Sequence, residues 1–297
     1  MSPAGGARVT WDAGRAPRGV DWLCRALGAA LGFVVGTLLG VRRAHVLGSL
    51  RRAGIAEPAR VAAAMYRRLG RGALELLALG LDGRGRIAPR LRRPSAATDV
   101  LALGRPCVVA TAHTGNWDWL ACAAAADAPL CVVTKHLSVG LLDRVWQRTR
   151  ARRGVQLVSA GRAAREALAA IRRGSRVAML IDQAPERARG TVIAPFLGAE
   201  ARVDLAPALL ALRARVPLVL AFAHRRADGS HAVVVAAVLE PPPRPSRRWA
   251  ESAMLRATAA LEGFVREHPA DWLWMHRRWK DAADAPVVSG SASAVPS

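Results

Sequence analysis

Alternating strand-like and helix-like segments fill the chain from residue 107 to residue 268. The strand-like segments are short, apolar and rich in β-branched residues, and they lie at 107–112, 130–134, 155–159, 176–182, 216–223 and 231–237. The helix-like segments lie at 117–125, 140–153, 163–173, 204–215 and 248–268. Such alternation is typical of parallel strands joined by helices. The sequence therefore predicts an α/β fold, with a mostly parallel central sheet flanked by helices.

A polar motif follows the first strand-like segment. It consists of His113, Thr114, Gly115, Asn116, Trp117 and Asp118. On one continuous helix, positions five apart lie about 140° out of phase, so His113 and Asp118 would not share a face. A strand end, a tight turn and a first helical turn instead allow the two side chains to meet at the carboxyl edge of the sheet, where open α/β sheets place their sites. A histidine and a carboxylate that orients it can activate a hydroxyl group.

Each residue of the motif also has a structural explanation. His113 taken alone could be a packed histidine. With Asn116 as the N-cap, Asp118 would lie in the first helical turn, where the helix dipole favours an acid. The motif holds no serine or cysteine, which favours direct base-assisted transfer over a covalent enzyme intermediate.

Two further clusters combine charge with apolar residues. Residues 182–198 begin where a strand-like segment ends and contain Asp182, Glu186, Arg187 and Arg189. They form either a solvated loop or, if they leave the same sheet edge as His113, a loop placed to bind an anionic substrate. Residues 271–280 interleave tryptophans with Arg, His and Lys. This pattern suits an interface with apolar and phosphate layers, stacking on nucleic-acid bases, or a packed amphipathic helix.

A charge-free apolar segment occupies residues 26–41. As a helix it would span about 24 Å, which is less than the roughly 30 Å of a hydrocarbon core. A signal peptide is disfavoured because Arg42 and Arg43 follow directly, where a small-residue cleavage site is expected. A buried helix is a second alternative. We favour an uncleaved helix that is embedded in a membrane or lies on its surface, with basic flanks against anionic head groups.

Composition narrows the possible partners and cofactors. The 297 residues carry a net charge of +22, almost all of it from arginine, which will attract anions such as phospholipid head groups, phosphorylated substrates or nucleic acid. The four cysteines (Cys24, Cys107, Cys122 and Cys131) lack metal-ligand spacing, so we expect buried free thiols and no metal.

These features predict four regions. We expect a flexible arm at 1–20, an N-terminal helical, membrane-associated segment at 21–95, the α/β domain at 96–281 and a disordered tail at 282–297.

The order of the motifs resembles that of the bacterial lipid A biosynthesis acyltransferases, within the lysophospholipid acyltransferase superfamily. The segment from His113 to Asp118 resembles the His-x4-Asp/Glu motif of that superfamily, and in its Gly-Asn-Trp-Asp form it also resembles actinobacterial phosphatidylinositol mannoside acyltransferases. Further similar segments are 41–50, 142–154, 182–196, 216–220 and 274–280.

The resemblance implies a membrane-associated O-acyltransferase without a resident cofactor, at the cytoplasmic face of the inner membrane. It would transfer a fatty acyl chain from an acyl carrier protein or coenzyme A thioester to a hydroxyl of a lipid A precursor. His113 would be the general base and Asp118 would hold its tautomer, without an acyl-enzyme. Backbone N–H groups between Gly115 and Asp118 would stabilise the oxyanion. The substrate-binding residues would be Gly115, Asn116, Arg144, Arg150, Asp182, Gln183 and Arg189.

The expected partners are an acyl carrier protein, a lipid substrate and the inner-membrane surface. Transfer to another glycolipid or to a lysophospholipid is the alternative within the same chemistry. A nucleic-acid-binding protein is a remote alternative, because the arginines are spread over the chain and the apolar N-terminal helix has no role in it.

Overall fold

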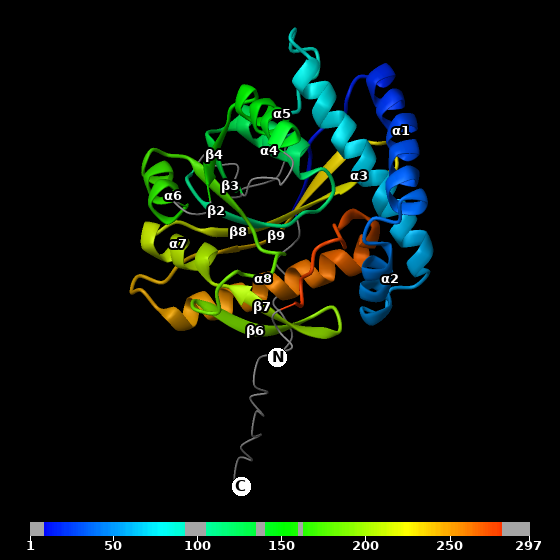
Figure 1. Cartoon of the computed structure of the whole chain (residues 1–297). Helices are drawn as coiled ribbons and strands as arrows, with labels where there is room; N and C mark the ends of the chain where they lie inside the picture. The colour runs from blue at the N-terminus through cyan, green and yellow to red at the C-terminus, as the bar shows by residue number, and fades with distance from the viewer. Residues whose placement is uncertain (1–8, 93–104, 135–139, 160–162, 281–297) are drawn as a thin grey trace.

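A computed structural model describes residues 9–92, 105–134, 140–159 and 163–280. Its centre is a seven-stranded sheet with the order β1-β9-β8-β2-β5-β3-β4 (Figure 1). The strands are β1 (Val9–Asp12), β2 (Val108–Thr111), β3 (Leu130–Thr134), β4 (Val155–Ser159), β5 (Arg176–Leu180), β8 (Leu218–Arg225) and β9 (His231–Leu239). β8, β2, β5, β3 and β4 run parallel, and β9 and β1 add antiparallel pairs at one edge. The predicted mostly parallel sheet is confirmed.

Helices cover both faces of the sheet because its strands bury side chains in both directions. Along β8, Leu218, Leu220 and Phe222 belong to one hydrophobic core, while Val219 and Ala221 belong to the other. The covering helices in this half of the chain are α4 (Trp117–Asp127), α5 (Gly140–Arg152), α6 (Ala163–Arg172), α7 (Ala206–Ala214) and α8 (Arg247–Glu267). Strands buried on both faces explain the nearly continuous apolar segments in the sequence.

The N-terminal third is helical, as predicted. It contains α1 (Arg18–Phe33), which continues as a π-helical turn η1 (Val34–Leu38), then α2 (Arg43–Arg52) and the long α3 (Pro58–Leu81). Helix α1 lies beside α3 in Figure 1. The helical segment Arg18–Leu38 is long and apolar enough to cross a membrane, by length and composition.

Over residues 9–20, which the structure describes, it differs from the flexible arm expected at 1–20. β1 pairs with β9, and the Trp11 side chain is fully buried in the core. Trp11 anchors this segment to the core, although the other residues of the segment show no apolar periodicity that would predict a strand. The expected tail at 282–297 and the expected boundary near residue 95 lie outside the described residues.

A two-stranded hairpin also occupies part of the segment that the sequence indicated as a loop. It consists of β6 (Thr191–Phe196) and β7 (Ala199–Asp204), and Phe196 and Val203 are buried in it. The hairpin packs against α8. The charged part of the loop is therefore confined to the residues between Asp182 and Thr191.

Candidate active site

Two neighbouring parallel strands bring His113 and Asp182 together. β2 and β5 pair in a register that matches Thr111 with Leu180. His113 and Asp182 each stand two residues beyond that pair, so they leave the same sheet edge at the same level. This confirms that the charged loop leaves the sheet beside His113.

The Asp182 carboxylate holds His113 at two points. The ring Nδ1 lies 3.0 Å from Oδ1, and the His113 backbone N–H donates to Oδ2 at 3.0 Å. The Trp272 indole N–H donates to Oδ2 at 2.9 Å. Burial alone would raise the pKa of Asp182, but the charge and hydrogen bonds of His113 hold it well below its usual range. A charged Asp182 fixes Nδ1 as the protonated nitrogen, which leaves Nε2 as the proton acceptor.

The basic aromatic segment near the C-terminus completes the site. The Leu273 N–H donates to the His113 carbonyl at 3.0 Å, and the Gly115 N–H donates to the Asp271 carbonyl at 2.7 Å. One 3-10 turn, η3 (Pro269–Asp271), leads into the segment, and extended and turn residues follow it. The alternative of a packed amphipathic helix is therefore wrong, since the segment is not helical and its backbone bridges to the motif.

A second histidine stands against the first. The His276 ring centroid lies 4.5 Å from that of His113, and burial, with the nearby charge of His113, lowers the pKa of His276 to about 4. His276 therefore remains neutral when His113 takes a proton. Donor atoms of His113, Asp182 and His276 lie within 4.8 Å of one another, a set that could hold a metal ion. Such an ion would have to displace the hydrogen bond between His113 and Asp182, so the arrangement fits a histidine–aspartate pair better than a metal centre.

Asp118 lies in the first turn of α4 and faces α5, where it meets Arg150. The Arg150 Nε donates to Asp118 Oδ1 at 2.7 Å, and Nη2 lies 2.5 Å from the same oxygen. Burial raises the pKa of Asp118, while Arg150 and, more weakly, His113 act in the opposite direction. In the described part of the chain, no hydrogen bond joins Asp118 to His113. The carboxylate that holds the imidazole is Asp182, which corrects the partner expected from the sequence.

The turn after His113 is shaped by Gly115 and Asn116. Gly115 has φ +58°, and a Cβ at this position would lie 2.8 Å from the Ala223 carbonyl oxygen, so only glycine fits. The Asn116 side chain accepts from the Trp119 N–H at 3.1 Å and caps α4, as predicted. Its Nδ2 donates to Glu75 at 2.7 Å. The structure thus gives both residues a role in building the turn, and direct substrate contact remains a prediction.

Of the other residues expected to bind substrate, one lies next to Asp182 along the chain and the others are exposed elsewhere. Gln183 follows Asp182, and its carbonyl accepts from the buried Arg278 at 3.3 Å. Arg189 is exposed on the loop before β6. Arg144 is exposed on α5, and its Nε donates to the Gly140 carbonyl at 3.4 Å. Among the described residues, neither Arg144 nor Arg189 contacts His113 or Asp182.

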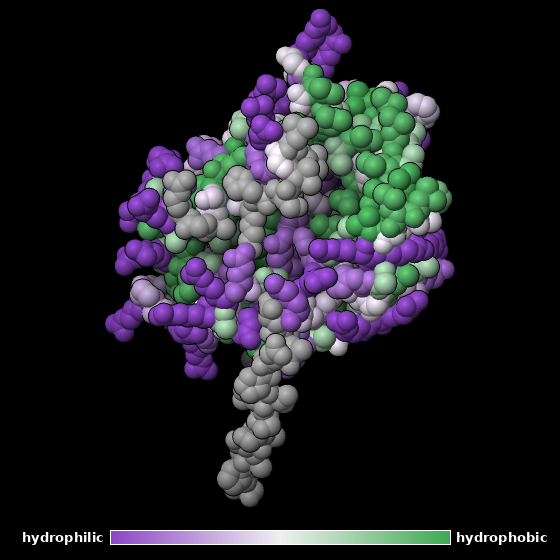
Figure 2. Space-filling model, viewed as in Figure 1, coloured by the Kyte–Doolittle hydropathy of each residue, from purple (hydrophilic) through white to green (hydrophobic). Residues whose placement is uncertain are grey.

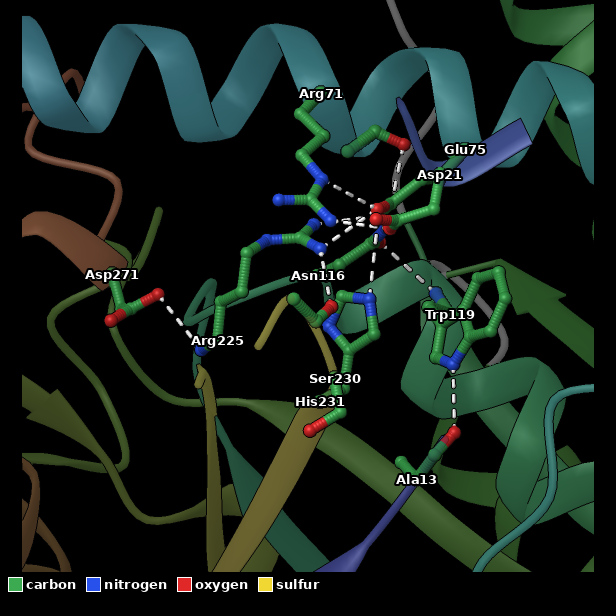
Figure 3. A network of polar contacts seen from close by, with 12 residues as sticks. Ala13, Asp21, Arg71, Glu75, Asn116, Trp119, Arg225, Ser230, His231 and Asp271 are labelled. Carbon is green, nitrogen blue, oxygen red and sulfur yellow. Dashed lines mark hydrogen bonds and ion pairs between the residues drawn. The ribbon is translucent and has the colours of Figure 1, made fainter. Parts of the chain in front are cut away.

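A buried cluster of charges supports the turn from α3 (Figure 3). Glu75 is 1 % exposed and accepts two hydrogen bonds from Arg225, at 2.7 and 2.6 Å, and one from Arg71 at 3.1 Å. Arg71 also pairs with Asp21 of α1 at 2.5 Å. Two arginines thus balance two carboxylates. Sequence reasoning missed this cluster, although a single acid within the apolar segment 74–79 was a signal for it.

Glu75→Gln is expected to lower the free energy of unfolding by about 3–5 kcal/mol, because it leaves buried arginines without their carboxylate. Burial would raise the pKa of Glu75, but the nearby His231, whose Nε2 lies 3.4 Å from Oε2, and the charge of Arg225 hold it below its usual range. The ionised Glu75 therefore stabilises the fold above about pH 4.3, and this contribution is lost as the pH falls below that value.

Denaturant unfolding between pH 3 and pH 7 measures both effects. Glu57→Gln is the control, because the Glu57–Arg60 pair is exposed and should contribute less than about 1 kcal/mol. Equal losses in the two variants, or an unchanged acid dependence in Glu75→Gln, would show that the cluster does not stabilise the fold.

The fold and the site define an α/β enzyme in which a buried aspartate holds a histidine at the carboxyl edge of the sheet. The chain matches the bacterial lipid A biosynthesis acyltransferase family over residues 23–281, and it belongs to this family. The resemblance seen in the motifs is confirmed, and the protein is an acyltransferase of lipid A and lipopolysaccharide biosynthesis. A comparison with curated proteins found no match.

Proposed function

We propose that the protein transfers a fatty acyl chain from an acyl carrier protein or coenzyme A thioester to a hydroxyl of a lipid A precursor, at the cytoplasmic face of the inner membrane. The observation that carries the proposal is the hydrogen bond between His113 Nδ1 and the buried Asp182. Because a thioester is already activated, the reaction needs a base on the acceptor hydroxyl and no resident cofactor.

The reaction proceeds in two proton transfers through His113. Nε2 takes the proton of the acceptor hydroxyl while the hydroxyl oxygen attacks the thioester carbonyl carbon. The tetrahedral intermediate then collapses, the carbon–sulfur bond breaks, and the imidazolium returns the proton to the leaving thiolate. The products are an ester and a free thiol. Asp182 stabilises the imidazolium between these steps.

The first turn of α4 supports the proposed oxyanion site. The Gly115 N–H donates to Asp271, and the Trp119 N–H donates to Asn116. The expected contribution of Gly115 is therefore withdrawn. The N–H groups of Trp117 and Asp118 have no partner within the helix because of their position, and they are the donors we assign to the oxyanion.

Surface charge supports the proposed partners. The net charge of +22 would steer an acidic carrier protein and an anionic lipid toward the enzyme. Arg189, exposed on the loop that Asp182 begins, is the candidate for a phosphate of either substrate. Arg150, which Asp118 holds, would need to exchange partners in order to bind a phosphate.

Deleting the gene and comparing lipid extracts by mass spectrometry tests the acceptor. We expect lipid A that is lighter by one secondary acyl chain, and expression of the intact gene should restore it. An unchanged lipid A together with an altered glycolipid or phospholipid would overturn the acceptor but retain the acyl transfer. Purified enzyme supplied separately with acyl carrier protein and coenzyme A thioesters then identifies the donor.

A further inference from the structure

Helix α1 has one face packed along α3. A Cβ at Gly28 would lie 2.5 Å from the Arg71 Cα, and one at Gly32 would lie 2.4 Å from the Tyr66 carbonyl oxygen. Contacts this short require glycine and hold the two helix axes close together. Cys24 is buried on the same face. The helix is therefore an integral part of the fold along its length.

The opposite face of α1 is apolar and exposed. Figure 2 shows a continuous hydrophobic area over α1 and the neighbouring end of α3, bordered by a band of hydrophilic side chains. The residues of this apolar face include Trp22, Leu23, Leu27, Leu31, Phe33, Val34, Leu38 and Leu39 from α1 and the residues after it, and Leu77 and Leu81 from α3. Exposed apolar areas of this kind mark protein or membrane contacts.

Basic side chains stand along this face. Arg18 and Arg25 are exposed on α1, and Arg42 is exposed just beyond its end. An apolar helix face with arginines at its margins complements an anionic lipid surface, where the leucines enter the acyl layer and the arginines meet phosphates. We take a bilayer as the partner, because it presents an apolar layer beside a phosphate layer and so matches both the leucines and the arginines.

The packing of α1 excludes a transmembrane orientation of the docked helix. Gly28 and Gly32, near the middle of α1, contact the backbone of Arg71 and Arg67 of α3. A docked α1 that crossed the bilayer would carry these arginines into the hydrocarbon, where each charge costs several kcal/mol. An undocked α1 would lose the Asp21–Arg71 ion pair and open the buried charge cluster around Glu75.

We propose that α1 and the end of α3 bind the membrane together as a monotopic surface, which inserts into one leaflet while the helix stays docked on the domain. Both ends of the chain then lie on the same side of the membrane. The inference rests on the membrane location in the proposed function, but it concerns topology and is measured without any acyl transfer.

Protease accessibility in inside-out inner-membrane vesicles tests the topology. The full chain carries one cleavable tag at each end, and the C-terminal tag reports that the domain faces outward. We expect both tags to be removed without detergent and the protein to stay bound in high salt. An N-terminal tag that is protected until detergent is added, or release of the protein by salt, would overturn the proposal. His113→Ala should give the wild-type pattern, so loss of the proposed function is distinguishable from loss of the proposed topology.

Binding to vesicles of phosphatidylglycerol and phosphatidylethanolamine tests the surface. We expect the Leu27→Gln/Leu31→Gln variant to bind at least about tenfold more weakly, because each leucine loses burial in the acyl layer. The matched control is Leu209→Gln/Leu255→Gln on α7 and α8, where each leucine is 40 % exposed, close to the 39 % of Leu31. The control should bind within about twofold of wild type. Equal binding by both variants would overturn the assignment of the surface.

Discussion

His113→Ala is expected to lower the turnover of acyl transfer by about 10³–10⁴-fold, the range that a positioned general base contributes with its orienting partner. The imidazole is 12 % exposed and is held through Nδ1 by Asp182. Its loss removes the group that takes the proton from the acceptor hydroxyl. Turnover of a purified variant with a saturating thioester donor measures the effect.

The loss of turnover can be assigned to His113 only if the His113→Ala protein is folded. Alanine keeps the backbone N–H that donates to Asp182, and the Trp272 indole still donates to the same carboxylate, so the variant should remain folded, which circular dichroism checks. Turnover near the wild-type rate in a folded His113→Ala protein would exclude His113 as the base.

Asp182→Asn is expected to lower turnover by about 10²–10⁴-fold, because an amide cannot stabilise the imidazolium or fix its tautomer as a carboxylate does. The loss should fall mainly on kcat and leave KM little changed, since Asp182 contacts His113 and Trp272 and is fully buried. Steady-state kinetics measures this split. A change confined to KM would indicate substrate binding instead.

Asp118 provides the matched comparison for Asp182. The sequence predicted that Asp118 holds the tautomer of His113, whereas the structure shows its carboxylate paired with Arg150. We therefore compare Asp118→Asn with the double variant Asp118→Asn/Arg150→Gln, which removes both charges. Recovery of activity in the double variant would mean that Asp118 acts by neutralising Arg150. Continued inactivity of a folded double variant, with Arg150→Gln alone active, would place Asp118 in the chemistry.

The sequence predicted individual elements better than their arrangement. The segments 130–134 and 155–159 coincide with β3 and β4, and the predicted helix at 117–125 lies within α4. These elements are visible because apolar periodicity is local to each segment. Strand order is not local. That β5 lies beside β2 is a property of the folded sheet.

The partner of His113 was missed for this reason. Asp118 is close to His113 along the chain, but Asp182 is close in space because Thr111 and Leu180 share a register position. The role of Trp272 was equally hidden, since its indole reaches Asp182 only after the C-terminal segment crosses the motif. The motif residues themselves could be identified, but the contacts among three distant segments could not.

The contacts of Asp21 have a practical consequence for obtaining a soluble form of the enzyme. A truncated protein that begins at α2 would lack Asp21 and so leave Arg71 with one carboxylate fewer. It would also expose the surface around Gly70, which lies against the Gly28 carbonyl. Such a truncation would weaken the buried charge cluster in which Glu75 accepts a hydrogen bond from the Asn116 side chain. Water solubility is better gained by exchanging exposed leucines for polar residues while the helix itself is kept.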